Sequence, residues 1–164
     1  GEALVARWQR LARECDLDVI LVGKAHWTLS EEDGLDPALK ASMVEDNPQG
    51  IGPAGGLLAA LRHGRDRPYV VTVACDMPYV SKKLLERLLA TDSQALAVAA
   101  TREGRWEPFL ARYRPSEAFA IVSSHVAEGS RSLRHFLKAL NCTALKLQPD
   151  EFRQLHDWDS PEDL

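Results

Sequence analysis

The sequence has no long apolar run, few cysteines and no excess of positive charge, and each absence excludes a class of protein. No stretch approaches the roughly 18 apolar residues of a membrane span, and no signal peptide is expected. The net charge of −4 gives no basic footprint for nucleic acid. The three cysteines, Cys15, Cys75 and Cys142, cannot all pair. They are expected to be reduced core thiols of a cytoplasmic protein.

Familiar metal-binding and phosphate-binding signatures are absent as well. The five histidines form no H-x-x-x-H pattern and no C-x-x-C occurs, so a structural zinc site is not expected. No Gly-Lys-Ser/Thr follows the glycine-rich stretch, and its spacing is not that of a dinucleotide-binding fingerprint. There is no repeat, low-complexity tract or linker. The 164 residues, 45% of them hydrophobic, therefore predict one globular domain spanning 1–164.

What the sequence does contain is an alternation of helical and strand patterns. Residues 3–15 have helical spacing, with Trp8 on the apolar face and the arginines at 7, 10 and 13 turned outward. Further helices are predicted at 53–63 and 82–90, from Pro115, after Ser130 as a cap, and from Ser160. Strands are predicted at 17–22, 41–44, 69–75, 95–100, 106–113 and 143–147. This order favours a three-layer, Rossmann-like α/β fold with a mainly parallel sheet.

Two chemical signals fall at the carboxyl edge of that predicted sheet, where ligands bind in open α/β folds. The strand at 69–75 runs directly into Asp76, and Pro78 then ends it. The alternative is that Asp76 only caps the helix near Ser81. The second signal is the glycine-rich stretch from Gly50 to Gly56, which offers backbone N–H groups to an anion at a helix N-terminus. Its alternative is an ordinary turn that packs a helix closely.

The two signals fit together only if a cation is present. A carboxylate beside a polyphosphate is repelled by about 4 kcal/mol per charge pair at ~4 Å and an effective dielectric of ~20. Mg²⁺ removes this conflict, since it usually takes one or two protein carboxylates together with phosphate oxygens and waters. The combination predicts a nucleotide–Mg²⁺ site in which Asp76 is the metal ligand.

These residues resemble those of the molybdenum cofactor guanylyltransferases, the MobA family. The resemblance rests on Asp46, on Gly52-Pro53-Ala54-Gly55-Gly56, and on the strand ending Ala74-Cys75-Asp76-Met77-Pro78. Downstream segments follow in the family's order: Glu107-Pro108-Phe109, Gly129 to Leu133, and Asp157 to Leu164. The resemblance extends along the whole chain.

The resemblance implies an enzyme that transfers GMP from GTP to the phosphate of molybdopterin and releases pyrophosphate, with Mg²⁺. Asp76 would be the catalytic residue that holds Mg²⁺. The other implied site residues are Lys24, Asp46 and Gly52 for the nucleotide, and Glu107, Pro108, Asp157 and Asp159 on the pterin side. A GTP-binding accessory protein and molybdoenzyme chaperones are the implied protein partners, and neither nucleic acid nor membrane is.

Three departures from the family pattern bear on this interpretation. The family's first strand and its glycine-rich loop have no counterpart in residues 1–164, so we expect a polypeptide that is longer at its N-terminus. A complete sheet without that strand would refute this expectation. Ala54 stands where the family turn carries a leucine. Asp157 and Asp159 stand where asparagines are usual, and either bind a second cation or belong to a solvated loop.

Two other functions remain open at this point. A cytidylyltransferase or a sugar-phosphate nucleotidyltransferase can be built on the same fold. A non-catalytic module that binds nucleotide or regulates a partner is the alternative from outside the enzymes.

Overall fold

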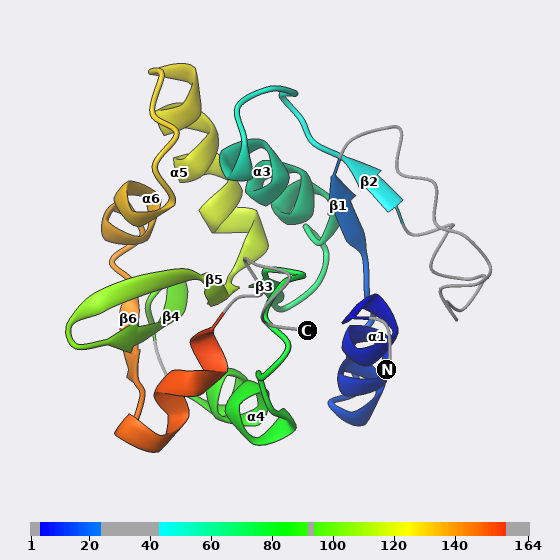
Figure 1. Ribbon diagram of the computed structural model, residues 1–164. Helices are drawn as coiled ribbons and strands as arrows, with labels where there is room; N and C mark the ends of the chain where they lie inside the picture. The colour runs from blue at the N-terminus through cyan, green and yellow to red at the C-terminus, as the bar shows by residue number, and fades with distance from the viewer. Residues whose placement is uncertain (1–3, 24–42, 92–93, 157–164) are drawn as a thin grey trace.

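Helices and strands alternate along the chain as the sequence pattern predicts. The computed structural model describes residues 4–23, 43–91 and 94–156 (Figure 1). The helices are α1 (Leu4–Glu14), α3 (Pro53–His63), α4 (Lys82–Ala90), α5 (Pro115–Ala127), α6 (Leu133–Ala139) and the 3₁₀ helix η2 (Pro149–Leu155), which the sequence pattern does not predict. The strands are β1 (Leu21–Gly23), β2 (Met43–Glu45), β3 (Val70–Val73), β4 (Ala97–Arg102), β5 (Arg105–Tyr113) and β6 (Thr143–Lys146). Within these ranges, no helix has the length and apolar character needed to cross a membrane.

Serine side chains fix the start of two helices. Ser81 caps α4, because its Oγ accepts a hydrogen bond from the N–H of Leu84 at 3.3 Å. Ser132 caps α6 in the same way, accepting from the N–H of His135 at 3.3 Å. The prediction that Ser130 caps this helix is therefore wrong by two residues. The hydroxyl of Ser130 lies 3.2 Å from the His135 ring instead.

The described strands form two sheets. The larger has the order β3-β5-β4-β6, in which β5 runs antiparallel to both of its neighbours and β4 and β6 are parallel. It follows that β3, β4 and β6 all run the same way. The smaller sheet is the parallel pair β1-β2. Every described pairing that does not involve β5 is parallel, and the α/β fold with a mainly parallel sheet is confirmed.

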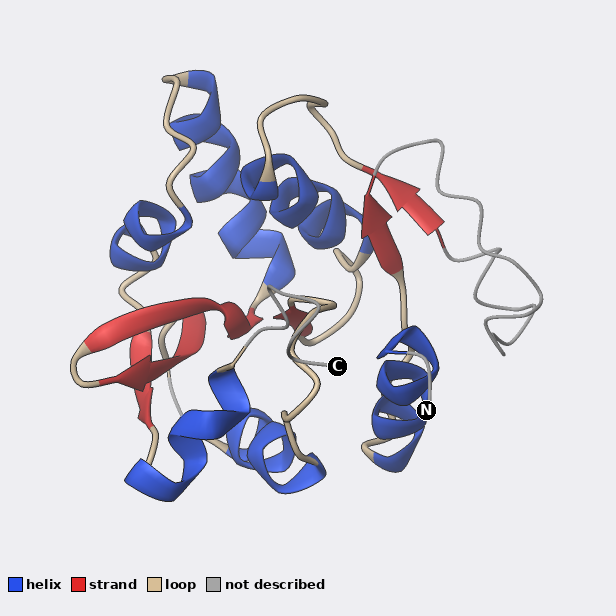
Figure 2. Cartoon of the chain, viewed as in Figure 1, coloured by secondary structure: helices blue, strands red, loops and turns tan. Residues whose placement is uncertain are grey.

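Helices cover both faces of the larger sheet, which makes the fold three-layered (Figure 2). Alternate residues of β4 point to opposite faces: Val98 and Ala100 into one apolar cluster, Ala97 and Ala99 into the other. The first cluster takes side chains from α1, α4 and η2. The second takes them from α3, α5 and α6. Each face of the sheet thus has its own core.

No hydrogen bond between described strands joins the two sheets, and β1 and β3 each leave one edge without a described strand partner. The strands on this side are short, three residues in β1 and in β2. The pairing of β1 begins at Leu21 rather than at 17, because the chain there is still closing α1, with the Leu17 N–H on the carbonyl of Ala12 at 2.9 Å. A continuous sheet, which would have refuted the expectation of a further strand, is not present among the described residues.

Candidate functional site

A cavity of about 460 Å³ lies between β1 and β3. Its walls are mainly apolar and come from residues 19–22 and 70–73. Val5 and Trp8 of α1 contribute from one helical layer, and Pro53 and Gly56 of α3 from the other. Past the end of β3 the lining includes two carboxylates, those of Asp76 and Glu107. The cavity thus joins an apolar slot between two strand edges to the carboxyl end of β3.

Asp76 lies in the loop that follows β3. Its Oδ1 atom is buried and has no hydrogen-bond partner among the described residues. Asp76 does not cap α4, since Ser81 does so. That outcome removes the alternative explanation for the acid at this position. A buried carboxylate oxygen without a donor has lost its solvation, and a bound cation would restore a partner to it.

The residues around Asp76 fit a hard divalent cation whose ligands are mostly phosphate oxygens and waters rather than protein side chains. No group of three or more His, Cys, Asp or Glu side chains in the described part of the chain is placed to enclose a metal. A zinc centre built from protein ligands needs such a group. Mg²⁺ does not, because one or two carboxylates suffice when phosphates and waters complete the octahedron. Asp76 is the residue that would hold it.

The N-terminus of α3 borders the same cavity through Pro53 and Gly56. Gly52 is the N-cap residue, with φ of 64°, and no described side chain caps the helix. Asp46 lies against this first turn: a Cβ on Gly56 would be 3.4 Å from its Oδ1. The α3 N-terminus therefore presents the partial positive charge of a helix start close to the Asp76 loop.

The β5 side of the cavity carries Glu107, Pro108 and Phe109. The Glu107 carboxylate lies 3.9 Å from the Arg102 guanidinium across the β4–β5 hairpin. Phe109 has an exposed fraction of 41%, which is high for a large apolar side chain beside a cavity. Its carbonyl accepts from the Ala74 N–H at 3.2 Å, so β5 is tied to the chain just ahead of Asp76.

Five of the eight predicted site residues lie at or beside the cavity, and the other three are not among the described residues. Asp76, Glu107 and Pro108 line the cavity, and Asp46 and Gly52 lie at the adjoining helix start. Lys24, Asp157 and Asp159 lie outside the described residues, as does the helix predicted from Ser160.

Two sequence-based expectations near the site are wrong. Cys75 is exposed rather than a core thiol, because the chain has left β3 two residues earlier. Its pKa is raised by partial desolvation and by the adjacent Asp76 carboxylate, so the thiol stays protonated at neutral pH. Arg7 does not point into solvent: its Nη2 donates to the carbonyl of Val80 at 2.7 Å. Helical periodicity gave no sign of this contact, because its partner is 73 residues away.

Comparison with known proteins agrees with this arrangement. Residues 1–144 match the model of the MobA-like NTP transferase domain. The molybdenum cofactor guanylyltransferase of Pseudomonas putida KT2440 is 28% identical over 166 residues, covering 100% of this chain and 82% of the relative. That of Pseudomonas entomophila L48 is 31% identical over 165 residues, covering 99% and 82%.

A solved structure shows the same fold. Molybdopterin-guanine dinucleotide biosynthesis protein A from Archaeoglobus fulgidus superposes with a TM-score of 0.72 at 23% identity, covering 98% of this chain and 80% of that one. The Asp76 carboxylate after β3, with its buried Oδ1, and the helix start at the same cavity thus occur in a chain that matches a nucleotidyltransferase model over most of its length. The chain belongs to the MobA-like NTP transferase family.

Proposed function

We propose that this protein transfers GMP from GTP to the phosphate of molybdopterin and releases pyrophosphate, in the biosynthesis of the molybdenum cofactor. The observation that carries the proposal is the buried, unpartnered Oδ1 of Asp76 beside an uncapped helix start. The names of the relatives at about 30% identity support guanylyl transfer in particular. A Mg²⁺ ion bound with the triphosphate would neutralise charge on the transferring phosphoryl group.

The chain's own residues would mainly position the two substrates. An oxygen of the acceptor phosphate forms a bond to the α-phosphorus of the nucleotide. The bond between the α-phosphorus and the oxygen that bridges it to the β-phosphorus breaks, so that pyrophosphate leaves. Asp76 would hold the cation, while Asp46 and Gly52 would contact the nucleotide at the α3 N-terminus. Glu107 and Pro108, on the β5 side, would face the pterin. Positioning, together with electrostatic stabilisation, is almost all that a protein contributes to phosphoryl transfer.

Some parts of the proposal involve residues or partners outside the described structure. Lys24 is proposed to contact the nucleotide, and Asp157 and Asp159 to face the pterin. A GTP-binding accessory protein and molybdoenzyme chaperones are proposed as partners, in the cytoplasm.

We also propose that one more strand fills the slot between β1 and β3, with residues 1–164 forming a single domain around it. Both facing edges lack a described strand partner, and the cavity between them is apolar. α1 packs beside the slot, and Trp8 contacts the carbonyl of Cys75 beyond the end of β3. A parallel strand leading into α1, and from there into β1, makes a right-handed βαβ unit. The relatives, of which 82% is matched, have length to supply it.

The decisive test of the function is the variant Asp76→Asn in the full-length protein. Removing the charge while keeping the shape should abolish Mg²⁺-dependent pyrophosphate release from GTP and molybdopterin, with an unchanged circular dichroism spectrum. Asp66→Asn is the matched control, because Asp66 is an exposed acid on a turn and does not line the cavity. Turnover of the Asp76→Asn variant at the wild-type rate would refute the role of Asp76.

The same assay separates the rival functions. GTP and CTP are compared as donors at equal Mg²⁺ concentration. Selectivity for CTP would make the protein a cytidylyltransferase or a sugar-phosphate relative. A folded protein that binds neither nucleotide would be the non-catalytic module.

A further inference from the structure

The loop of residues 74–81, which carries Asp76, is fixed by its own buried side chains and by contacts from helices far from it in sequence. Its own apolar side chains are the first anchor: Met77 is 5% exposed and Val80 is fully buried. Both lie in the cluster that α1 and α4 share. Asp76 lies directly ahead of these two anchors, so the backbone on either side of it sets where the carboxylate points.

α1 holds two carbonyl groups of this loop. The indole Nε1 of Trp8 donates to the carbonyl of Cys75 at 3.4 Å, and the Arg7 guanidinium donates to the carbonyl of Val80 at 2.7 Å. One carbonyl precedes Asp76 directly and the other follows it by four residues. Trp8 is 8% exposed, and its hydrogen bond to the carbonyl of the exposed Cys75 is partly buried. α1 therefore holds the backbone on both sides of Asp76, at Cys75 and at Val80.

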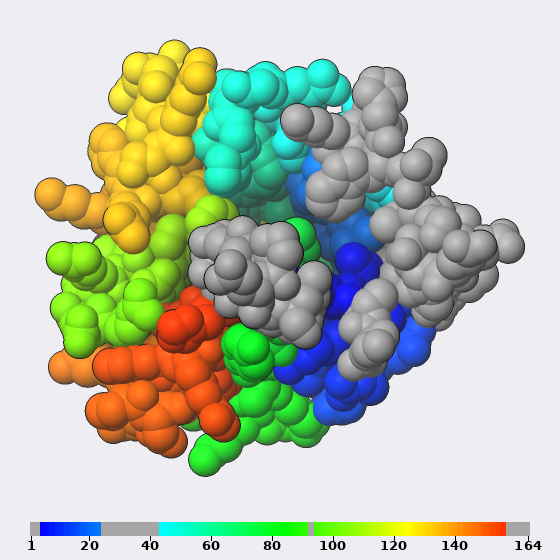
Figure 3. Space-filling view, viewed as in Figure 1, coloured from blue at the N-terminus to red at the C-terminus, as the bar shows by residue number. Residues whose placement is uncertain are grey.

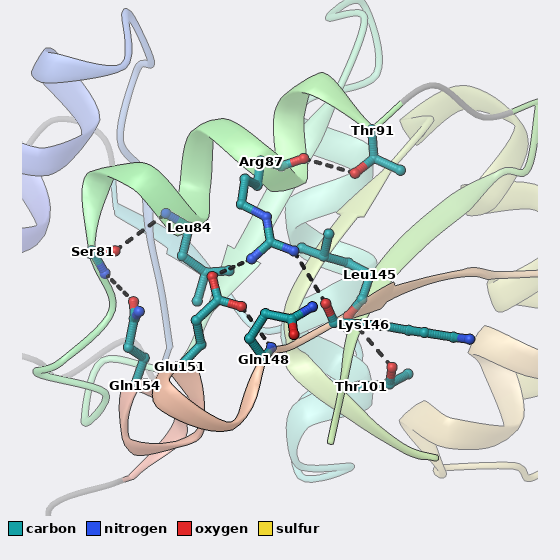
Figure 4. Close-up of polar contacts among 10 residues, drawn as sticks. All are labelled: Ser81, Leu84, Arg87, Thr91, Thr101, Leu145, Lys146, Gln148, Glu151 and Gln154. Atoms are coloured by element: carbon teal, nitrogen blue, oxygen red, sulfur yellow. Dashed lines mark hydrogen bonds and ion pairs between the residues drawn. The ribbon is translucent and has the colours of Figure 1, made fainter. Parts of the chain in front are cut away.

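The other end of the loop is held by η2. The side-chain oxygen of Gln154 accepts a hydrogen bond from the Ser81 N–H at 2.9 Å (Figure 4). This contact occurs at the residue that caps α4. In the space-filling view, the blue surface of α1, the green surface of the loop and α4, and the red surface of η2 lie together on one face (Figure 3). The loop passes between the first and the last described helices.

η2 is itself attached firmly to α4. The Arg87 guanidinium forms an ion pair with the carboxylate of Glu151, and it also donates to the carbonyl of Lys146 at 3.2 Å (Figure 4). The second carboxylate oxygen of Glu151 accepts from the Gln148 N–H at 2.8 Å. Gln154 thus lies on a helix, η2, that is attached to α4 by the Arg87–Glu151 ion pair.

We propose that Arg7, Trp8 and Gln154 are positioning residues for Asp76, which hold the loop in the geometry that binds a divalent cation together with a nucleoside triphosphate. This inference rests on the proposed function. A loop that is already ordered loses no conformational freedom when the cation binds, so the three contacts add to cation affinity without touching substrate. Their loss weakens cation binding, and an excess of cation restores the rate.

The test uses Arg7→Met, Trp8→Phe and Gln154→Met in the full-length protein. Mn²⁺ binding in the presence of GTP is measured by electron paramagnetic resonance, and the Mg²⁺ dependence of turnover in parallel. Each variant should weaken Mn²⁺ binding by about fivefold, as expected for one lost hydrogen bond. The rate at saturating Mg²⁺ should stay that of the wild type. Amide hydrogen exchange in residues 74–81 should become faster in the same variants.

Two controls separate positioning from general stability. Arg10→Met removes an arginine of the same helix that pairs with Glu14 at the surface, and it should leave Mn²⁺ binding unchanged. Arg7→Lys keeps a charged donor and should restore part of the affinity. Trp8→Phe tests the indole N–H with most of the packing kept.

The outcomes also distinguish this inference from the proposed function. Unchanged Mn²⁺ binding in all three variants, with Asp76→Asn abolishing it, would overturn the positioning role and leave the function standing. Mn²⁺ binding that survives Asp76→Asn would overturn both the positioning role and the assignment of the cation to Asp76. A variant that loses turnover at saturating cation, rather than affinity, would also contradict the proposal.

Discussion

At the scale of single residues, the buried carboxylate of Glu151 is stabilised by a contact with Arg87 that composition does not reveal. Glu151 is 8% exposed, and the hydrogen bond from Arg87 lowers the pKa of its carboxyl. Because the folded-state pKa lies below that of the unfolded chain, the carboxylate stabilises the fold at neutral pH. That contribution is fully present above the unfolded pKa of about 4.3 and is lost as the pH falls through the folded pKa.

We therefore predict that Glu151→Gln lowers the free energy of unfolding at pH 7 by about 2 kcal/mol, the range of a hydrogen bond to a charged group. The difference from the wild type should shrink as the pH falls below about 4, where the wild-type carboxylate becomes protonated. Urea denaturation at pH 7 and in acid measures both. Glu86→Gln is the control: its side chain is 52% exposed in a surface pair with Lys82, so little change is expected. A pH-independent difference would contradict the charge argument.

At the scale of elements, the start of α3 is packed closely against the loop before it. A Cβ on Gly55 would lie 2.4 Å from the carbonyl oxygen of Pro48 and 3.2 Å from Ile51 Cγ1. Gly56, the next residue, has its nearest neighbour at 3.4 Å, an ordinary contact. The glycine-rich sequence is therefore needed for close packing at Gly55, which is one of the two explanations the sequence left open. The other explanation, that backbone N–H groups of this stretch bind an anion, is compatible with this packing.

We expect Gly55→Ala to destabilise the protein by about 2 kcal/mol, because the carbonyl of Pro48 is backbone and must move with its chain. Gly56→Ala, on the same helix, should be neutral or stabilising by up to about 1 kcal/mol through helix propensity. Thermal unfolding of the two variants side by side provides the comparison. Equal midpoints would show that the loop moves aside at little cost.

At the scale of the whole molecule, the sheet is interrupted where the cavity lies. β3 is paired with β5 on one edge and β1 with β2, while the edges that face the slot carry no described strand. α3 packs against both sheets, and Leu57 and Leu58 of this helix belong to the second core cluster. In the part of the chain that the structure describes, the two sheets are therefore joined through the helical layer rather than through backbone hydrogen bonds.

If a further strand fills the slot, amide exchange should report it. In a protein made of residues 1–164, the amides of β1 and β3 should exchange faster than those of β4, which has a partner on both sides. In the full-length protein their exchange should slow, and that of β4 should not change. Hydrogen exchange followed by mass spectrometry measures all three strands together. Equal protection of β3 and β4 in residues 1–164 would argue against the proposed strand.

The amino-acid sequence by itself determined the elements whose signals are local. The bounds of α3 and α4 match the predicted 53–63 and 82–90, because prolines, glycines and a capping serine act within a few residues. The placement of Asp76 after a strand followed from the same kind of pattern, although β3 is half-buried rather than buried. The order of motifs was also sufficient to indicate the family.

Only the tertiary structure decided what depends on distant residues. The antiparallel direction of β5, the gap between β1 and β3, and the attachment of η2 through Glu151 are set by pairing between segments far apart in the chain. Arg7 looks like a solvated arginine in sequence, and its carbonyl partner at Val80 becomes visible only when α1 is packed. Periodicity reports which face of a helix is apolar, whereas a hydrogen bond between segments depends on how the packed elements bring its two atoms together.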